Sequence, residues 1–349
     1  MQKSATDQLP KIAIIGAGMA GLSLAHFLDG YADVTLFEKS RGVGGRMSTR
    51  YAQHYQFDHG AQFFTARSKS FNTFLKPLLA DGTVQPWQPR VLTLALDEQG
   101  RAKKPYKRDW FEPHYVAAPK MNHLAKVLAK ERDIHLETQL SGLKKTVGGW
   151  VLEDIQGHQH GVFDWVVSTA PAPQTAALLP QTFSGYADIR HTNMEGCYCL
   201  MLGLSEPLDV NWQAAVAKDS CIAWIAVDSS KPGRGSACSL VVHTTNEWAE
   251  QHLEDDQQEV EKQLFLALQR LVGESLTQVE FKKLHRWRYA TSVGSEQEKD
   301  STPSCLFDPA LQLGVCGDWL LDGHVESAFL SALALSKKII PWLGRDASI

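Results

Sequence analysis

A glycine-rich turn near the N-terminus constrains this chain of 349 residues more than any other feature. The turn follows an apolar run at residues 12–15 and consists of Gly16, Ala17, Gly18, Met19, Ala20 and Gly21. A second apolar run, residues 34–37, ends at Glu38. A strand, a G-x-G-x-x-G turn, a helix and a second strand with an acidic end are typical of a dinucleotide-binding βαβ unit. The sequence therefore predicts parallel strands over the two runs and a helix over residues 18–28 between them.

Each glycine of the turn has its own physical task. Without a Cβ atom, Gly16 permits the tight turn, Gly18 lets the backbone approach a pyrophosphate, and Gly21 lets the helix pack close to the strand. The amides at the start of the helix then face the phosphate charge. Glu38 is placed to accept hydrogen bonds from the hydroxyls of the adenosine ribose.

Composition narrows the class of protein. Hydrophobic residues make up 44% of the chain and charged residues 21%, which is typical of a globular protein. The net charge of −4 gives no indication of a nucleic-acid-binding surface. We expect no membrane span, because no run of about twenty apolar residues occurs. We also expect no signal peptide, because the segment before the first strand, residues 1–10, is short and polar and contains no apolar h-region.

The cysteines indicate a reducing compartment. All six are scattered and none forms a C-x-x-C pair: Cys197, Cys199, Cys221, Cys238, Cys305 and Cys316. This spacing argues against a disulfide framework and against a zinc site. We therefore expect a cytoplasmic protein without a structural metal.

The apolar pattern predicts further elements that belong with the dinucleotide-binding βαβ unit. In chain order we expect a loop at 39–50, a helix at 119–130, short strands between 134 and 162, strands at 165–169 and 313–316, and a helix from Val325. The helix at 119–130 is predicted from the apolar stripe of Met121, Leu124, Val127 and Leu128.

The composition changes between about residues 178 and 281. Mostly apolar runs predict the strands of an antiparallel sheet at residues 197–204, 221–227 and 237–244. Residues 84–116 are expected to join this block. A helix in two pieces is predicted over 247–272, and its second piece places Val260, Leu264, Leu268 and Leu271 on one face. Because the block carries no nucleotide signature, we assign it to the substrate.

Three features favour FAD over NAD as the cofactor. The first is the loop after Glu38, in which three glycines lie between Arg41 and Arg46. Such a loop can lie against the pyrophosphate, and Arg46 can neutralise phosphate charge. Lys39 and Met47, which flank the loop, are also predicted to contact the cofactor. The alternative interpretation is a solvated basic loop.

The second feature lies near the C-terminus. FAD is long and needs a second cradle for its ribityl and isoalloxazine parts. Asp318, at the end of a strand, can bind ribityl hydroxyls. The amides of the helix that begins near Val325 can point at the flavin edge that becomes negative on reduction. The alternative is an amphipathic closing helix with an aspartate cap.

The third feature is the segment around residues 57–64. Gly60 and Ala61 are small enough to let the chain pass close to a flat ring, and Gln62 could reach the ring or the substrate. We include its neighbour Phe63, and Leu140 of the short strands, among the predicted FAD contacts. An ordinary turn between two core segments is the alternative.

These residues carry a family resemblance. Beyond the fingerprint, the motifs that carry it are Ser40–Met47, Asp58–Thr65, Ser229–Arg234, Val242–Thr245, His285–Ala290 and Cys316–Trp319. With them the chain resembles the FAD-dependent amine-oxidase-like superfamily, and most closely the renalases, particularly their bacterial members. The resemblance covers nearly the whole chain. The four motifs between Ser40–Met47 and Cys316–Trp319 are the more specific to renalase-like proteins.

The resemblance implies an α/β fold of p-hydroxybenzoate-hydroxylase-like architecture. A Rossmann-type domain would bind FAD without a covalent bond, because Cys316 lies within a strand and is expected to be buried. A second, α+β domain built on an antiparallel sheet would bind the substrate. We assign residues 1–78, 117–177 and 283–349 to the first domain, and 79–116 and 178–282 to the second.

The resemblance also implies an activity. It is the oxidation of the 2- or 6-dihydro isomers of NAD(P)H to NAD(P)+ by hydride transfer to flavin N5, after which molecular oxygen reoxidises the flavin and gives hydrogen peroxide. No catalytic side chain is required, because the flavin accepts the hydride. His243 could bind a carboxamide, while Trp287 and Tyr289 could flank a flat ring. Core packing is the alternative for all three.

Two other classes stay open. A flavin amine oxidase or a desaturase-like oxidoreductase would come from the same superfamily. A non-enzymatic FAD- or NAD-binding module is disfavoured, because the large central block has no part in holding the nucleotide. The sequence leaves the oligomeric state and the preferred isomer open.

Overall fold

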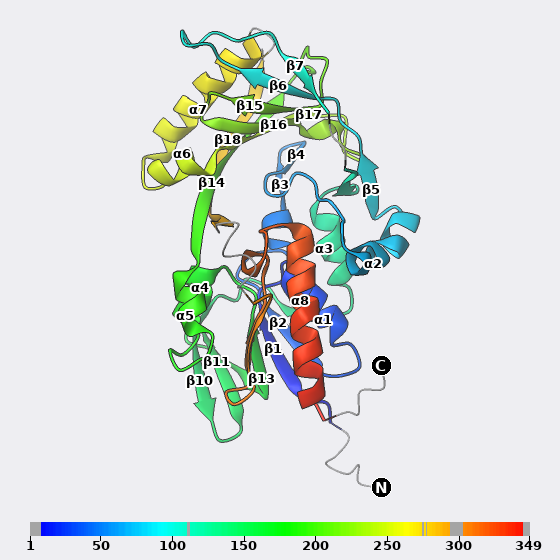
Figure 1. Ribbon diagram of the computed structural model, residues 1–349, viewed down its shortest axis with the longest axis vertical. Helices are drawn as coiled ribbons and strands as arrows, with labels where there is room; N and C mark the ends of the chain where they lie inside the picture. The colour runs from blue at the N-terminus through cyan, green and yellow to red at the C-terminus, as the bar shows by residue number, and fades with distance from the viewer. Residues whose placement is uncertain (1–7, 110–111, 274–275, 277, 294–302, 345–349) are drawn as a thin grey trace. The chain divides into compact units, whose positions relative to one another are not determined.

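The chain folds into two compact units in a computed structural model that describes residues 8–109, 112–273, 276, 278–293 and 303–344 (Figure 1). Unit 1 comprises Met1–Gly45, Ala125–Met194 and Ser292–Ile349. Unit 2 comprises Arg46–Leu124 and Glu195–Thr291. In each unit, strands supply the core and helices cover it.

A six-stranded sheet forms the centre of unit 1, in the order β19-β20-β13-β1-β2-β9. Its strands are β1 (Lys11–Ile15), β2 (Asp33–Phe37), β9 (Asp133–His135), β13 (Trp165–Ser168), β19 (Leu306–Asp308) and β20 (Leu313–Val315). All neighbours pair in parallel except β19, which is antiparallel to β20. The predicted parallel pair of strands is therefore confirmed, and Ile12 lies opposite Val34.

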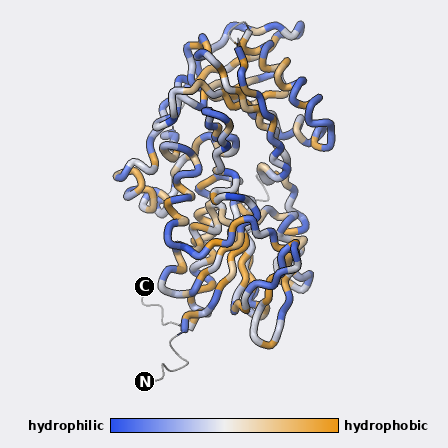
Figure 2. The backbone as a smooth tube through the Cα atoms, turned by 180° about the vertical axis from the view of Figure 1, so that it is seen from behind, coloured by the Kyte–Doolittle hydropathy of each residue, from blue (hydrophilic) through white to orange (hydrophobic). Residues whose placement is uncertain are grey.

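Helices cover this sheet, which is why its strands are apolar along their length and not in alternation. The helices of unit 1 are α1 (Met19–Phe27), α4 (Ala172–Leu178), α5 (Tyr186–His191) and α8 (Val325–Ile339). Helices α1 and α8 lie side by side, and the rings of Phe27 and Phe329 meet edge to face at 5.2 Å (Figure 1). The strands are drawn mostly orange in Figure 2, as expected for a buried parallel sheet.

A three-stranded antiparallel sheet completes unit 1. It consists of β10 (Leu140–Thr146), β11 (Gly149–Asp154) and β12 (Gln159–Phe163), and it confirms the short strands expected there. Gly149 has φ +136°, and a Cβ atom there would lie 2.5 Å from the carbonyl oxygen of Phe163. Leu140 is buried in a cluster with Trp150 of β11 and Phe37 of β2.

Unit 2 is built on a seven-stranded sheet in the order β18-β14-β17-β16-β15-β6-β7. Its strands are β6 (Val91–Ala95), β7 (Tyr106–Arg108), β14 (Asn193–Leu204), β15 (Ala214–Lys218), β16 (Ile222–Val227), β17 (Cys238–Thr244) and β18 (Val279–Val293). The pairs of β14 with β17 and of β17 with β16 are antiparallel, as expected. Strand β15, which the sequence analysis did not predict, is antiparallel to β16. The pair of β15 with β6 is parallel, so the sheet is mixed.

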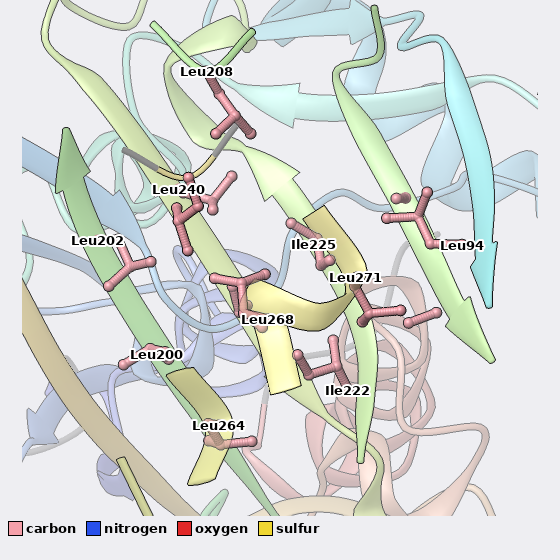
Figure 3. Packing of buried hydrophobic residues seen from close by; sticks show 14 of the residues in the cluster. Leu94, Leu200, Leu202, Leu208, Ile222, Ile225, Leu240, Leu264, Leu268 and Leu271 are labelled. Atoms are coloured by element: carbon pink, nitrogen blue, oxygen red, sulfur yellow. The ribbon is translucent and has the colours of Figure 1, made fainter. Parts of the chain in front are cut away.

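Helix α7 (Gln257–Val272) covers one face of this sheet, and the short α6 (Asn246–Gln251) precedes it. Figure 3 shows its side chains Leu264, Leu268 and Leu271 directed at Leu200 and Ile225 of the sheet. The two helical pieces and their apolar face are therefore confirmed.

The remaining elements of unit 2 lie within residues 46–124. They are the hairpin β3 (Thr49–Ala52) and β4 (Tyr55–Asp58), the pair β5 (Val84–Trp87) and β8 (His114–Ala117), and helix α2 (Lys69–Ala80). Helix α3 (Asn122–Leu128) begins in unit 2, and its residues from Ala125 onward belong to unit 1. Helix α3 begins later than the predicted residue 119. The Asp58 carboxylate accepts from the amide of Met121 at 3.0 Å, and the Thr49 hydroxyl accepts from the amide of Asn122 at 3.4 Å. These side chains satisfy amides at the start of the helix.

The units differ from the predicted domain boundaries. Residues 46–78, 117–124 and 283–291 belong to unit 2. Tyr55 and Phe57 of the first of these segments pack against Met201 and Val241 of its sheet. Residues 178–194 belong to unit 1, where Phe183 and Ile189 join its core. In the described part of the chain, no helix is long and apolar enough to cross a membrane.

Candidate functional site

The glycine turn of unit 1 has the geometry of a phosphate cradle. Gly16 has φ +106°, and a Cβ atom at Gly21 would lie 2.0 Å from the Gly16 carbonyl oxygen, so both positions require glycine. A Cβ atom at Gly18 would meet no described atom of the chain within 4 Å. The space at Gly18, at the N-terminus of α1, is therefore open for a ligand.

The loop after β2 lies against this turn, and its predicted contact with the pyrophosphate stays a prediction. The Gly44 amide donates to the Ala17 carbonyl oxygen at 2.8 Å, and a Cβ atom at Gly45 would lie 3.5 Å from the Cα atom of Gly18. Lys39 is exposed within the same loop. The loop thus borders the open space in front of Gly18.

Glu38 directly follows β2 and is a buried, fixed carboxylate. One of its oxygens accepts from the amide of Ala17 at 3.0 Å and the other from the amide of Ser40 at 2.8 Å. Each carboxylate oxygen keeps further acceptor capacity, which ribose hydroxyls can use. Leu140, by contrast, belongs to the core of unit 1, and its contact with a cofactor stays a prediction.

The second predicted cradle of unit 1 is also held in place. The Gly317 amide donates to the Ser331 hydroxyl of α8 at 2.9 Å, and the Gly323 amide donates to the Asp318 carbonyl oxygen at 3.0 Å. Asp318 is buried, and α8 begins at Val325 as expected. The turn, the fixed acid and this helix start together fit an ADP-containing cofactor such as FAD.

In unit 2, the segment 58–63 makes the close approach that its small residues predicted, although to different groups. A Cβ atom at Gly60 would lie 1.9 Å from the Arg46 carbonyl oxygen and 3.3 Å from the Trp287 ring. The Ala61 amide donates to the same carbonyl oxygen at 2.8 Å. Gly60 is therefore required by the chain's own backbone and indole.

The side chains near this approach are also engaged. The Arg46 guanidinium donates to the Ala290 carbonyl oxygen at 3.1 Å, and Met47 is buried. Phe63 packs among aromatic rings, with centroids 4.3 Å from His114 and 5.6 Å from Trp224. Contacts of Arg46, Met47, Ala61 and Phe63 with a cofactor stay predictions.

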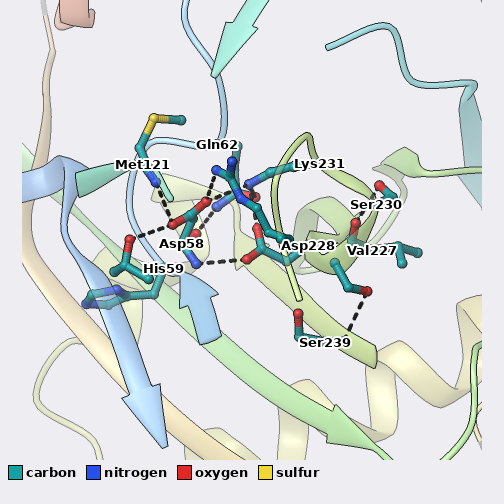
Figure 4. Close-up of polar contacts among 12 residues, drawn as sticks. Asp58, His59, Gln62, Met121, Val227, Asp228, Ser230, Lys231 and Ser239 are labelled. Atoms are coloured by element: carbon teal, nitrogen blue, oxygen red, sulfur yellow. Dashed lines mark hydrogen bonds and ion pairs between the residues drawn. The ribbon is translucent and has the colours of Figure 1, made fainter. Parts of the chain in front are cut away.

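Gln62 is buried and held at both ends of its amide (Figure 4). Its Nε2 donates to the carbonyl oxygens of Asp58 and Gly60, the latter at 3.1 Å. Its Oε1 accepts from Lys231 Nζ at 3.2 Å. The sequence placed this residue at the site without indicating which groups orient it.

A buried network of charges surrounds Gln62. Lys231 Nζ lies 2.5 Å from Asp228 Oδ1 and 3.8 Å from Asp58 Oδ2. Arg234 donates to Asp58 Oδ2, and the Asp58 amide donates to Asp228 Oδ2 at 2.9 Å. The two carboxylates and two cations balance in formal charge, which makes their burial tolerable.

The two carboxylates differ in acidity. Burial disfavours ionisation of Asp58, but the charges of Lys231 and Arg234 outweigh it and hold its pKa below the usual value. Burial raises the pKa of Asp228, which faces one of these cations and also the Asp58 charge. The network therefore offers no free negative charge.

Next to the network, aromatic and imidazole rings converge on the backbone of His59. Its carbonyl oxygen accepts from Trp287 Nε1 at 2.8 Å and is 3.1 Å from His243 Nε2. The His59 ring stacks on the Trp287 ring at 5.0 Å, and the His285 ring meets the Trp287 ring edge-on at 4.4 Å. We call His59, His243, His285 and Trp287 the imidazole–indole cluster.

The cluster is uncharged at neutral pH. Burial, helped by nearby positive charge, lowers the pKa of His59 to about 3. Burial likewise lowers the pKa of His243 to about 4 and that of His285 to about 4. This surface therefore suits a neutral, flat ligand, with imidazole nitrogens as hydrogen-bonding groups.

Of the predicted substrate residues, the structure brings His243 and Trp287 together through His59. Tyr289 lies two residues further along β18 and is half-buried. Sequence reasoning did not assign a role to His59, His285 or Lys231. Side chains alternate between the two faces of a strand, so His285 is expected on the same face as Trp287 and Tyr289, and this signal could have indicated it.

Two further predictions concern cysteines and metals. Cys316 is buried, and burial raises its pKa far above the usual value, so its thiol is poorly reactive. Among the residues that the structure describes, no group of three or more potential ligands could hold a metal ion.

Two family models match the sequence. Residues 14–78 match an NAD(P)-binding Rossmann-like domain, and residues 92–340 match the flavin containing amine oxidoreductase family. The first match covers the glycine turn and the 58–63 segment. The second covers Asp228, Lys231 and Arg234 of the charged network and the second cradle.

Known proteins agree with these matches. The chain is 25% identical to mouse renalase (Mus musculus) over 350 aligned positions, which cover 94% of this chain and 98% of the relative. It has the fold of a protein assigned as a protoporphyrinogen oxidase from Exiguobacterium sp. 255-15, with a TM-score of 0.73, 11% identity and coverage of 95% and 99% of the two chains. A putrescine oxidase bound to putrescine gives a TM-score of 0.72 at 11% identity, with the same coverage.

Proposed function

Because the chain belongs to the flavin containing amine oxidoreductase family, we propose that it is an FAD-dependent oxidase of dihydronicotinamide dinucleotides. Its substrates are the 2- and 6-dihydro isomers of NADH or NADPH, and its product is NAD(P)+. Molecular oxygen reoxidises the flavin and is reduced to hydrogen peroxide. The observation that carries the proposal is the similarity to renalase along nearly the entire chain.

FAD is the cofactor of this renalase-like oxidoreductase. The open space at Gly18, the fixed carboxylate of Glu38 and the start of α8 fit its nucleotide part. When bound, FAD accepts a hydride at N5 and passes electrons to oxygen. The residues of the chain need only bind the donor, orient it and exclude water.

The imidazole–indole cluster supports a neutral hydride donor. A dihydropyridine becomes aromatic when it loses hydride, so no side chain has to remove a proton. In this proposal Trp287 and Tyr289 flank the flat ring, and His243 binds the carboxamide. The low pKa values of His59 and His243 keep the surface free of charge that would oppose the cationic product.

The charged network disfavours the alternative of an amine oxidase. A protonated amine is best bound by a free carboxylate or an aromatic cage. Asp58 and Asp228 are both committed to Lys231 and Arg234, and both are buried. They therefore offer no charge to an amine.

Anaerobic mixing tests the proposed substrate class. Purified FAD-loaded protein is mixed with the 2- or 6-dihydro isomer of NAD or NADP, and flavin absorbance is followed in a stopped-flow instrument. We expect at least one isomer to bleach the flavin rapidly. Once oxygen is admitted, the flavin colour should return and hydrogen peroxide should form. Ordinary 4-dihydro NADH and putrescine serve as controls. Bleaching by putrescine, and by no dihydronicotinamide, would assign the protein to the amine oxidases instead.

Acid precipitation tests the mode of cofactor binding. Because the Cys316 thiol is buried and poorly reactive, we expect all yellow colour to remain in the supernatant. Colour retained in the washed pellet would mean a covalent flavin.

A further inference from the structure

Thr169 directly follows strand β13, and its side chain contacts the glycine turn of unit 1. Its hydroxyl donates to the carbonyl oxygen of Ile15 at 2.9 Å and to that of Gly16 at 3.3 Å. A Cβ atom at Gly16 would lie 2.6 Å from this hydroxyl oxygen, and one at Gly21 would lie 3.1 Å from it. The hydroxyl therefore uses the space that these two glycines leave open.

The peptide group between Gly16 and Ala17 is held at both of its ends. Its carbonyl oxygen, on Gly16, accepts from Thr169 Oγ1, and its N–H, on Ala17, donates to Glu38 Oε2 at 3.0 Å. A peptide group is planar, so a rotation that moves its carbonyl oxygen also moves its N–H. The Thr169 hydroxyl thus restrains the direction from which the Ala17 amide meets the carboxylate.

The Glu38 carboxylate depends on this amide for its orientation. The Ser40 amide holds Oε1 at 2.8 Å, and the Ala17 amide holds Oε2. Two restraints, one on each oxygen, fix the rotation of the carboxylate group about its last bond. The remaining lone pairs of the two oxygens then keep fixed directions, as the recognition of ribose hydroxyls requires.

Thr169 is itself held in place within unit 1. Its amide donates to the Ile15 carbonyl oxygen at 2.9 Å. The carbonyl oxygen of the next residue, Ala170, accepts from Thr175 Oγ1 at 2.9 Å and from Trp319 Nε1 at 3.1 Å. These bonds fix the backbone from which the hydroxyl extends, so the hydroxyl can orient the groups that it contacts.

We propose that Thr169 is a positioning residue for the adenosine end of FAD. Its hydroxyl holds the Gly16–Ala17 peptide, and this peptide holds the Glu38 carboxylate in the orientation that binds the ribose hydroxyls. All of these residues belong to unit 1. The inference goes beyond the proposed function, because it needs FAD as the cofactor and makes no assumption about the substrate.

Three variants separate the hydroxyl from the shape of the side chain. Thr169→Val removes the hydroxyl and keeps the branched shape, whereas Thr169→Ser keeps the hydroxyl and removes the methyl group. Thr146→Val is the matched control. It deletes another threonine hydroxyl of unit 1, which donates to the Gly149 carbonyl oxygen at 2.9 Å in the hairpin of β10 and β11.

The readout is the dissociation constant of the cofactor for the apo protein, measured by flavin fluorescence. Each protein is titrated with FAD and with an FAD analogue that lacks both hydroxyls of the adenosine ribose. Thr169→Val should weaken FAD binding about 3- to 10-fold, as for the loss of one hydrogen bond. Thr169→Ser and Thr146→Val should stay within about 2-fold of the unmodified protein. For the analogue, Thr169→Val should also stay within about 2-fold, because the hydroxyls that Glu38 would bind are absent.

Three results would overturn the proposal. They are unchanged FAD binding by Thr169→Val, an equal loss in Thr169→Ser, and equal losses for FAD and the analogue in Thr169→Val. A merely structural role of Thr169 predicts the third result, because a distorted turn would weaken the binding of both ligands alike.

A measurement on the unmodified protein covers the case in which Thr169→Val does not fold. The unmodified protein should bind the analogue at least about 10-fold more weakly than FAD, because hydrogen bonds to a fixed carboxylate are stronger than those between neutral groups. Equal affinities would mean that Glu38 does not bind the ribose and would overturn the inference. No titration contains a substrate, so failure of the isomer assay would leave this inference standing, and failure of the titrations would leave the assay unaffected.

Discussion

Single residues of this protein show that one residue type serves different physical needs. Gly21 is required because its own turn leaves no room for a Cβ atom, and Gly60 because the Arg46 backbone leaves none. Gly18 has open space around it, so the chain itself does not demand glycine there. A pyrophosphate bound at the turn would require glycine at this position, because it would occupy the space of a side chain.

Alanine substitutions at Gly18 and Gly21 should therefore have different effects. Gly18→Ala should leave the thermal unfolding temperature nearly unchanged but weaken FAD binding at least about 10-fold, because the new methyl occupies the space for the phosphates. Gly21→Ala should lower the unfolding temperature by several degrees, as for an overpacked core position that costs about 1–3 kcal/mol. Thermal scans of the apo proteins and FAD titrations check both. Equal loss of stability in the two variants would contradict this distinction.

At the scale of elements, helix α7 illustrates how a local pattern becomes a buried face. Its apolar side chains recur every three or four residues, and Asp256 caps its start by accepting from the amides of Gln258 and Glu259. The stripe packs on β14 and β16 (Figure 3). Leu266, on the other side of the helix, is 46% exposed, whereas Leu264 is fully buried.

This pair of leucines tests the orientation of α7. Leu264→Ala should lower the free energy of unfolding by about 2–5 kcal/mol, because it leaves a cavity in the core. Leu266→Ala should change it by less than about 0.5 kcal/mol, as for other exposed positions. Urea denaturation followed by circular dichroism measures both. Similar values for the two variants would show that the helix does not bury this face.

For the molecule as a whole, the neutral histidines link stability to pH. In the unfolded chain a histidine binds a proton below its usual pKa of about 6.5, but His59 stays neutral in the fold until its pKa of about 3. Between these values the unfolded state binds more protons, so the free energy of unfolding falls as the pH falls. His243 and His285, each with a pKa of about 4, act in the same direction.

A histidine variant isolates this contribution. We expect the unmodified protein to lose stability between pH 6 and pH 4.5 more steeply than His59→Gln, by up to about 1.4 kcal/mol per pH unit. The exposed His191→Gln is the control and should keep the slope of the unmodified protein. Urea titrations at several pH values supply the slopes. Parallel curves for all three proteins would mean that His59 is protonated in the fold.

The sequence by itself determined the local units. The βαβ unit, the acid at the end of its second strand, the stripe of α7 and the start of α8 all follow from patterns within a few dozen residues, where backbone geometry and apolar period act directly. The same patterns and the family resemblance selected FAD and a renalase-like oxidoreductase, which the family matches confirm.

Only the tertiary structure decided which distant residues meet around residues 58–62. Lys231, His243 and Trp287 come from three segments, and their meeting depends on sheet order, register and loop contacts that no local pattern encodes. The unit boundaries have the same origin, since Tyr55 packs across a large sequence separation on Met201. Long-range packing also brings Gly60 close to the indole of Trp287, and its contact with a cofactor ring stays a prediction.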